Sequence, residues 1–158
     1  MKIAVVMGSK SDLPKLESGI DLIKSYGIEV VVRILSAHRT PMELTSFLDE
    51  IKDNTDVIIA AAGKAAHLPG VIAAQTLIPV VGLPIKSSTM DGLDSLLSIV
   101  QMPSGIPVAT VTIDSGMNAA LMAIQIASVK YPVLREKLAG YRKEMEEKVL
   151  ADDASVGF

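Results

Sequence analysis

Cysteine is absent from this chain of 158 residues, and histidine occurs only twice. Without cysteine the chain forms neither disulfides nor thiolate nucleophiles, which is consistent with a reducing compartment such as the cytoplasm. Two histidines and no cysteine also leave little from which to build a zinc site. Composition alone does not exclude magnesium held by carboxylates.

Aromatic residues, positive charge and long apolar runs are also scarce. The chain has three tyrosines, two phenylalanines and no tryptophan, and its formal net charge is −3. It therefore lacks the basic surface and stacking residues that are typical of nucleic-acid-binding proteins. No apolar run approaches the roughly 18–20 residues that a membrane span requires, and the N-terminal MKIAVVMG predicts a strand rather than a signal peptide. We expect neither nucleic acid nor membrane among its partners.

Hydrophobic residues, by contrast, are abundant. They make up 49% of the chain, and the mean hydropathy is +0.42. Such values are high for a small monomer, because a domain of this size has only one core in which to bury them. We expect the chain to bury further apolar surface against copies of itself, as a homo-oligomer.

Apolar runs rich in Val, Ile and Ala alternate with segments of helical period. The runs are nearly continuous, which is typical of strands covered on both faces. They span residues 2–8, 29–35, 56–63, 79–84 and 107–113, and the helical segments 13–23, 44–51, 67–76, 91–101 and 116–130. This alternation predicts an α/β fold, a three-layer α/β/α sandwich around a parallel sheet of about five strands. No linker or repeat divides the chain, so we expect one domain over residues 1–158, with its core in about 1–130.

A last helix is predicted over residues 132–150. Its apolar residues form a narrow stripe amid dense charge: Leu134, Leu138, Tyr141, Met145 and Val149. The stripe suits packing on the chain's own domain or on a neighbouring subunit, and the high overall hydrophobicity favours the neighbour. The terminal DDASVGF is predicted to be frayed.

Three loops follow predicted strands, where ligands bind in open parallel sheets. The first, MGSKSDLP at residues 7–14, carries Ser9, Ser11 and Asp12 at a helix start. Hydroxyls and free N–H groups there suit a phosphate or a ribose, although the same residues are also ordinary N-caps. The loop matches neither G-x-G-x-x-G nor a Walker A motif.

The second loop lies in LSAHRTPMEL, residues 35–44. Its T-P-M-E segment, residues 40–43, predicts a capping box with proline at the first helical position. Ser36, His38 and Arg39 then lie in the turn between strand and helix. Arginine offers a planar fork for phosphate, and histidine both donates and accepts a proton near neutral pH. The alternative is an ordinary polar surface loop.

The third loop lies in AAAGKAAHLPG, residues 60–70. Its small residues let a ligand approach the backbone closely, although they equally let a helix pack closely on the sheet. His67 adds the second imidazole, and Lys64 is a cation set among glycine and alanines.

Four segments, MGSKSD, SAHRTP, AAHLPG and QMPSGIPVAT, together carry a resemblance. In order and spacing they resemble the bacterial and archaeal aminoimidazole ribonucleotide (AIR) carboxylase/mutase family of purine biosynthesis, over about residues 3–130. The resemblance implies a flavodoxin-like fold in a cytoplasmic homo-octamer with active sites between subunits. It also implies that the C-terminal helix reaches a neighbour.

The resemblance further implies formation of 4-carboxy-5-aminoimidazole ribonucleotide (CAIR). In the mutase branch, the carboxylate comes from the carbamate N5-carboxyaminoimidazole ribonucleotide; in the AIR carboxylase branch, it comes from free carbon dioxide. Neither branch uses biotin, ATP or a metal, so no cofactor is expected. By position, His38 resembles the general acid/base. The substrate-binding positions are Ser9, Ser11, Asp12, Ser36 and Arg39, and the carbon dioxide pocket comprises Gly63, Lys64, Ala65, Ala66, His67 and Leu68.

Lys64 departs from the mutase pattern. Mutases typically read AGGAAHLPG where this chain reads AGKAAHLPG. Carboxylases carry a basic residue after AG but lose AAHLPG, and Ser104 in MPSG also leans toward them. We expect the mutase, with the carboxylase as the alternative. A more remote alternative is a non-catalytic module that binds a nucleotide phosphate, because fold alone does not fix function.

Overall fold

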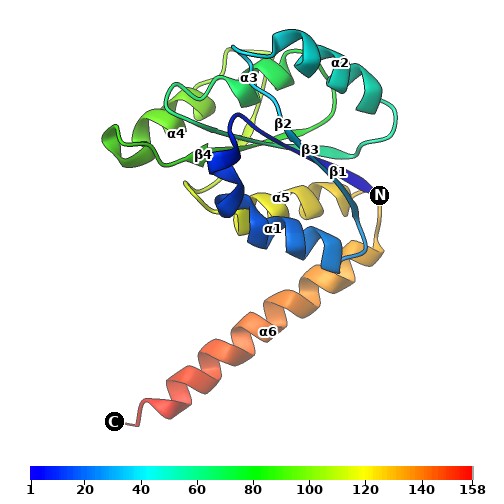
Figure 1. Ribbon diagram of the computed structural model, residues 1–158. Helices are drawn as coiled ribbons and strands as arrows, with labels where there is room; N and C mark the ends of the chain where they lie inside the picture. Colours follow the sequence, from blue (N-terminus) through cyan, green and yellow to red (C-terminus); the bar gives the residue numbers. More distant parts are fainter. Residues whose placement is uncertain (158) are drawn as a thin grey trace.

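A five-stranded parallel sheet forms the centre of the computed structural model, which describes residues 1–157 (Figure 1). The strand order β2-β1-β3-β4-β5 is that of flavodoxin-like folds. The strands are β1 (Lys2–Met7), β2 (Glu29–Ile34), β3 (Val57–Gly63), β4 (Val80–Ile85) and β5 (Ala109–Thr110). The helices are η1 (Lys10–Asp12), α1 (Leu13–Ser25), α2 (Pro41–Ile51), α3 (Leu68–Ala73), η2 (Met90–Gly92), α4 (Leu93–Val100), α5 (Gly116–Ala127) and α6 (Val133–Ser155).

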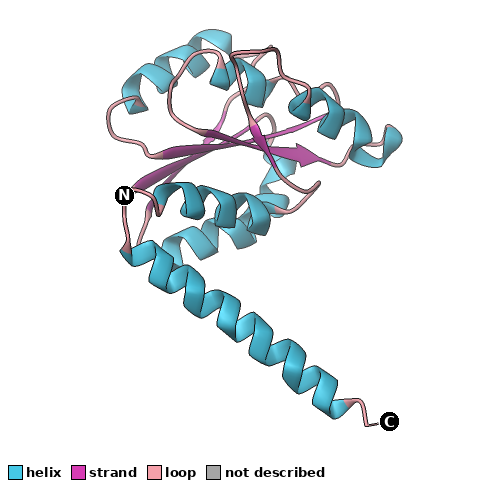
Figure 2. Cartoon of the chain, turned by 180° about the vertical axis from the view of Figure 1, so that it is seen from behind, coloured by secondary structure: helices cyan, strands magenta, loops and turns pink. Residues whose placement is uncertain are grey.

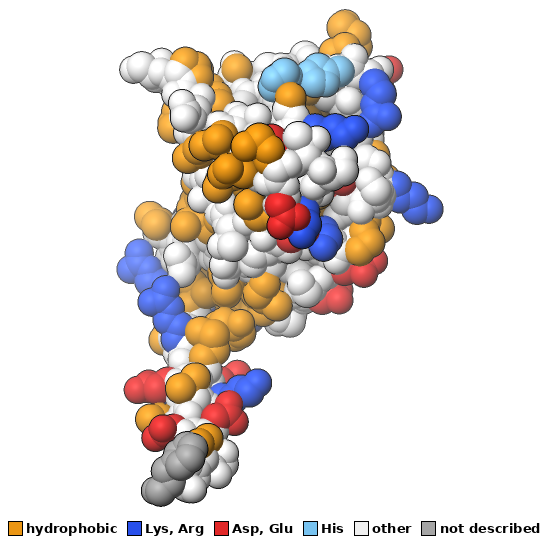
Figure 3. Space-filling view, turned by 90° about the vertical axis from the view of Figure 1, so that its left-hand side faces the viewer, with side chains coloured by type: hydrophobic (Ala, Val, Ile, Leu, Met, Phe, Trp, Pro, Cys, Tyr) orange, Lys and Arg blue, Asp and Glu red, His pale blue; other side chains and the backbone are white. Residues whose placement is uncertain are grey.

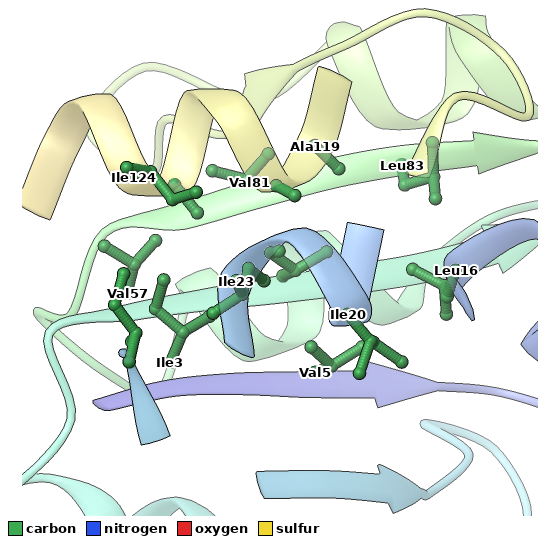
Figure 4. Close-up of a cluster of buried hydrophobic side chains, with 14 of the residues drawn as sticks. Ile3, Val5, Leu16, Ile20, Ile23, Val57, Val81, Leu83, Ala119 and Ile124 are labelled. Atoms are coloured by element: carbon green, nitrogen blue, oxygen red, sulfur yellow. The ribbon is translucent and has the colours of Figure 1, made fainter. Parts of the chain in front are cut away.

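Helices cover both faces of the sheet, as Figures 1 and 2 show from opposite sides. Alternate residues of β1 point to opposite layers, because side chains in a strand have a period of two. Ile3 and Val5 pack toward α1 and α5, where Figure 4 shows Val5 beside Ile20, while Ala4 and Val6 pack toward α2 and α3. The predicted three-layer sandwich is therefore confirmed.

The second strand differs from its prediction. We expected all strands to be covered on both faces, but β2 is an edge strand whose residues are exposed or half-buried. Val32 is 39% exposed and Ile34 49%. An apolar run indicates that a strand is buried, but not whether its own chain or another copy of the chain buries it. In the single chain, the edge at β2 is uncovered.

The fifth strand is shorter than predicted, because only Ala109 and Thr110 of the expected 107–113 pair with β4. Pro84 of β4, whose carbonyl faces this side, has no N–H to donate, which limits the ladder between β4 and β5. Single hydrogen bonds from the N–H of Val111 to Gly82 and from the N–H of Asp114 to Pro84 continue the alignment.

The last helix is longer than predicted and reaches Ser155, so most of the segment expected to fray is helical. Leu134 and Leu138 are buried in the core beside α1 and α5, so the first turns of α6 pack on the chain's own domain. Beyond them the helix projects away from the sheet (Figure 1), and Met145 and Val149 are exposed. Packing of this part on a neighbour stays a prediction. Within residues 1–157, no helix is both long and apolar enough to cross a membrane.

Candidate active site

A cavity of about 680 Å³ lies beyond the carboxyl ends of the strands. The loops that follow β1, β2, β3 and β4 all contribute to its wall, as expected for an open parallel sheet. The structure brings together every predicted site residue. Those that line the cavity include Ser9, Ser11, Asp12, Ser36, His38, Arg39, Gly63, Lys64, Ala65, Ala66, His67 and Leu68.

The two histidines form a pair in this cavity. His38 follows β2 and His67 directly precedes α3, yet His38 Nε2 lies 2.8 Å from His67 Nδ1, within hydrogen-bond distance. The rings meet edge to face, with centroids 4.9 Å apart and planes at 84°. Figure 3 shows them side by side on the surface, near lysine or arginine side chains. One nitrogen must donate and the other accept, so the tautomers of the two neutral rings are coupled.

Arg39 and Ser36 form a second cluster in the same wall. Ser36 Oγ accepts hydrogen bonds from the backbone N–H of Arg39, at 3.2 Å, and from that of His38, at 3.4 Å. Arg39 Nη2 donates to the carbonyl of Gly8 at 2.8 Å, which ties the loop after β2 to the loop after β1. The guanidinium is therefore positioned beside Ser36 with further N–H groups to donate.

The helix after this turn begins at Pro41, as predicted, but the prediction of a capping box is wrong. Thr40 makes no side-chain bond to the first turn of α2. Its Oγ1 instead accepts from the N–H of Ser36 at 2.8 Å and donates to the Ser36 carbonyl at 3.2 Å. Thr40 thus closes the turn that carries His38 and Arg39, because a threonine hydroxyl bonds to backbone groups on either side of it in the chain.

Ser9, Ser11 and Asp12 surround the start of α1. Ser9 Oγ caps η1 by accepting from the N–H of Ser11, and the two serine hydroxyl oxygens lie 2.9 Å apart, within hydrogen-bond distance. Burial raises the pKa of the Asp12 carboxyl, the hydrogen bond from Ser11 only partly offsets this effect, and the nearby Asp114 carboxylate adds to it. A desolvated acceptor at the cavity wall is suited to donors on a ligand, such as hydroxyl or amino groups.

The end of β3 and the loop that follows it form part of the cavity wall. A Cβ on Gly63 would lie 3.3 Å from the carbonyl oxygen of Ile85, tighter than most such contacts. Lys64 follows with φ of 55°, in the left-handed region, and its carbonyl accepts from the N–H of Ala66 at 2.8 Å. Leu68 is buried and starts α3. The small residues therefore fit both interpretations of this loop: they permit tight packing against β4, and they leave space for a ligand in the cavity.

Sequence reasoning missed the loop after β4, which also lines the cavity through Lys86, Ser87 and Ser88. The backbone N–H of Lys86 donates to Asp114 Oδ1 at 2.8 Å, and its ammonium group pairs with Asp91. The signal is present in the sequence, since K-S-S directly follows a buried strand.

The sequence profile described as AIR carboxylase matches residues 2–148. The chain belongs to the AIR carboxylase family. Its relatives in this family include the N5-carboxyaminoimidazole ribonucleotide mutase of Pyrococcus horikoshii, 51% identical over 148 residues that span 93% of this chain and 84% of that protein. The mutase of the same name from Saccharolobus solfataricus is 48% identical over 95% of this chain and 96% of that protein.

A solved structure supports the same membership. The crystal structure of Treponema denticola PurE is similar with a TM-score of 0.91 and 30% sequence identity, covering 99% of both chains. The AIR carboxylase fold therefore extends along nearly the whole chain, α6 included.

Proposed function

We propose that the protein is an N5-carboxyaminoimidazole ribonucleotide mutase of de novo purine biosynthesis. It would convert the carbamate substrate to CAIR by moving a carboxylate to carbon 4 of the imidazole. The observation that carries this proposal is one cavity with a paired imidazole, His38 and His67, close to a positioned guanidinium, Arg39. The mutase names of relatives aligned over most of both chains support the same reaction.

The phosphate of the ribonucleotide would bind at Arg39, Ser11 and Ser36. Arginine matches phosphate through two parallel N–H donors, and hydroxyls complete the set. Ser9 and Asp12 would contact the ribose and the base, where the buried carboxylate accepts hydrogen bonds from hydroxyl or amino groups. These contacts fix the orientation of the imidazole relative to His38.

His38 would transfer the proton in both halves of the reaction. It donates a proton to the carbamate nitrogen as the N–C bond breaks and carbon dioxide departs. Carbon 4 then attacks carbon dioxide, and His38 removes the proton from carbon 4, which restores the aromatic ring. The proton returns to the same imidazole, so the net reaction is an isomerisation. The hydrogen bond to His67 would hold His38 in one orientation through both steps.

The small residues after β3, Gly63, Ala65 and Ala66, would form the pocket that retains carbon dioxide together with Leu68. Retention beside the ring makes the second step effectively unimolecular, which is worth several kcal/mol in favourable cases. The alternative AIR carboxylase would use the same nucleotide site and proton shuttle with carbon dioxide from solution.

We also propose that residues 1–158 act as one catalytic domain in a cytoplasmic homo-octamer. The uncovered edge of β2 and the projecting part of α6 support assembly, because both expose apolar side chains, among them Ile34 and Met145. Light scattering at micromolar concentration is expected to give an oligomer, and a monomer would contradict this proposal.

The test of the reaction compares two carboxylate donors with the purified protein. We expect faster CAIR formation from the carbamate than from AIR with bicarbonate. The His38→Asn variant should keep nucleotide binding while kcat falls by about 10²- to 10⁴-fold. Turnover close to that of the unaltered protein in His38→Asn would contradict the assignment of His38 as the general acid/base. Activity with AIR and bicarbonate but not with the carbamate would identify the carboxylase instead.

A further inference from the structure

Three cationic side chains line the cavity, and they differ in their hydrogen-bond and ion-pair partners. Arg39 donates to the carbonyl of Gly8, and the ammonium group of Lys86 pairs with Asp91. Within residues 1–157, the ammonium group of Lys64 takes part in none of the ion pairs. Lys64 is also exposed to solvent within the cavity. Arg39 is in no ion pair either, but among the described residues Lys64 is the cation there whose side chain makes neither an ion pair nor a hydrogen bond.

Lys64 also has a backbone conformation that is unfavourable for a residue with a side chain. Its φ of 55° lies in the left-handed region, which costs a residue with a side chain roughly 1–2 kcal/mol and costs glycine little. The hydrogen bond from the N–H of Ala66 to the Lys64 carbonyl, 2.8 Å long, holds the turn in that conformation. A side chain kept at a position that favours glycine points to a role for that side chain.

The expected ligands differ in charge at the imidazole, where some carry a carboxylate and AIR does not. The carbamate substrate and CAIR each carry a phosphate and a carboxylate on or beside the imidazole, whereas decarboxylated AIR carries the phosphate alone. Arg39 and the serines account for the phosphate, so the second anionic group still needs a cation. Among the residues that line the cavity, Asp12 is the only acidic side chain to compete for one.

We propose that Lys64 binds the carboxylate on the heterocycle and thereby makes the site prefer carboxylated ribonucleotides over AIR. This inference rests on the proposed function and assigns Lys64 as a specificity-determining residue within it. A lysine ammonium is a compact charge that suits a carboxylate whose position changes between nitrogen and carbon 4. Carbon dioxide is neutral, so the ion pair exists in substrate and product and is absent in the intermediate.

This difference sets the kinetic signature. A contact made to the carboxylated ground states contributes to their affinity and does not accelerate the loss of carbon dioxide. Removing the charge should therefore raise KM for the carbamate while kcat stays the same or rises. A group that acted in the proton steps would instead lower kcat.

The experiment measures the dissociation constants of CAIR and AIR by calorimetry with the full-length protein. For Lys64→Met, we expect CAIR to bind about 10- to 100-fold more weakly, the range for a lost charged hydrogen bond, and AIR to change less than about twofold. Lys64→Arg should retain most of the preference. Lys24→Met, on the exposed C-terminal part of α1, is the matched control and should change neither constant.

Lys64→Gly guards against a folding artefact, because glycine accepts the left-handed conformation and should give the same loss of preference as Lys64→Met. Equal weakening of CAIR and AIR, or no weakening of either, would overturn the role of Lys64 while the unaltered protein still converts the carbamate. Failure of the unaltered protein to bind or convert these nucleotides would overturn the proposed function and this inference together.

Discussion

His38 and His67 come from different loops, and their ring nitrogens Nε2 and Nδ1 lie 2.8 Å apart. The pair joins the loop after β2 to the start of α3, so each imidazole restricts the other's rotation. From the sequence, His67 was predicted only to line the carbon dioxide pocket. In the structure it contacts His38, the group proposed to transfer the proton. We therefore predict that His67 positions His38.

Replacing His67 with phenylalanine keeps a planar ring and removes the hydrogen bond. We expect kcat to fall by about 10- to 100-fold, corresponding to a loss of 1–3 kcal/mol, with little change in KM. His67→Gln keeps a polar partner for His38 and should recover part of the loss. Steady-state kinetics separate the two constants, and an unchanged kcat in His67→Phe would exclude the positioning role.

Asp12→Asn should reduce activity without reducing stability. Burial raises the pKa of Asp12, so its charge disfavours the folded state once the pH exceeds the ordinary value of about 3.9. Asparagine removes that cost at neutral pH and still accepts from Ser11. Thermal unfolding at pH 7 should give an equal or higher Tm, an advantage that disappears as the pH falls to about 4 and below. A clear drop in Tm at pH 7 would show that the carboxylate stabilises the fold.

Asp56→Asn should show the opposite pH dependence. Burial alone would raise the pKa of Asp56, but hydrogen bonds from Lys130 Nζ at 2.9 Å, Lys2 N–H at 2.9 Å and the Tyr131 hydroxyl at 3.1 Å outweigh it and lower the pKa. The stabilisation is therefore present above about pH 3.9 and is lost as the pH falls through the lower folded-state value.

Urea unfolding should show Asp56→Asn less stable by about 1–3 kcal/mol at pH 7, with the gap closing toward pH 3. The control is Asp21→Asn, at an exposed position of α1. A gap that stays constant from pH 7 to pH 3 would mean that the charge of Asp56 is not its source.

Gly19→Ala should destabilise the contact between α1 and α5. A Cβ at Gly19 would lie 2.2 Å from the carbonyl oxygen of Gly116, so the helices must separate, at a cost of about 1–3 kcal/mol. Gly140→Ala is the matched control, since Gly140 lies in α6 with nothing within 4 Å, and should stabilise by up to about 1 kcal/mol. Equal unfolding free energies for the two variants would contradict the close approach of the helices.

The sequence predicted the layers, and the gathering of the candidate site residues in one place, because both follow from local patterns. Strands and helices alternate with distinct hydrophobic periods, and the carboxyl ends of parallel strands share one edge, so Ser11, Arg39 and His67 were expected near one another. Tertiary choices were less predictable. The hydroxyl of Thr40 bonds backward to Ser36 instead of forward, and the exposure of Ile34 depends on which partner covers β2.

The origin of the transferred carboxylate tests the central claim most directly. The carbamate substrate, labelled with ¹³C in its carboxylate, is converted by the protein in excess unlabelled bicarbonate, and CAIR is analysed by mass spectrometry. In the proposed mechanism carbon dioxide stays in the pocket beside His38, so we predict that CAIR retains most of the label. Label diluted to the level of the bicarbonate pool would contradict the mutase and show that the carboxylate comes from solution.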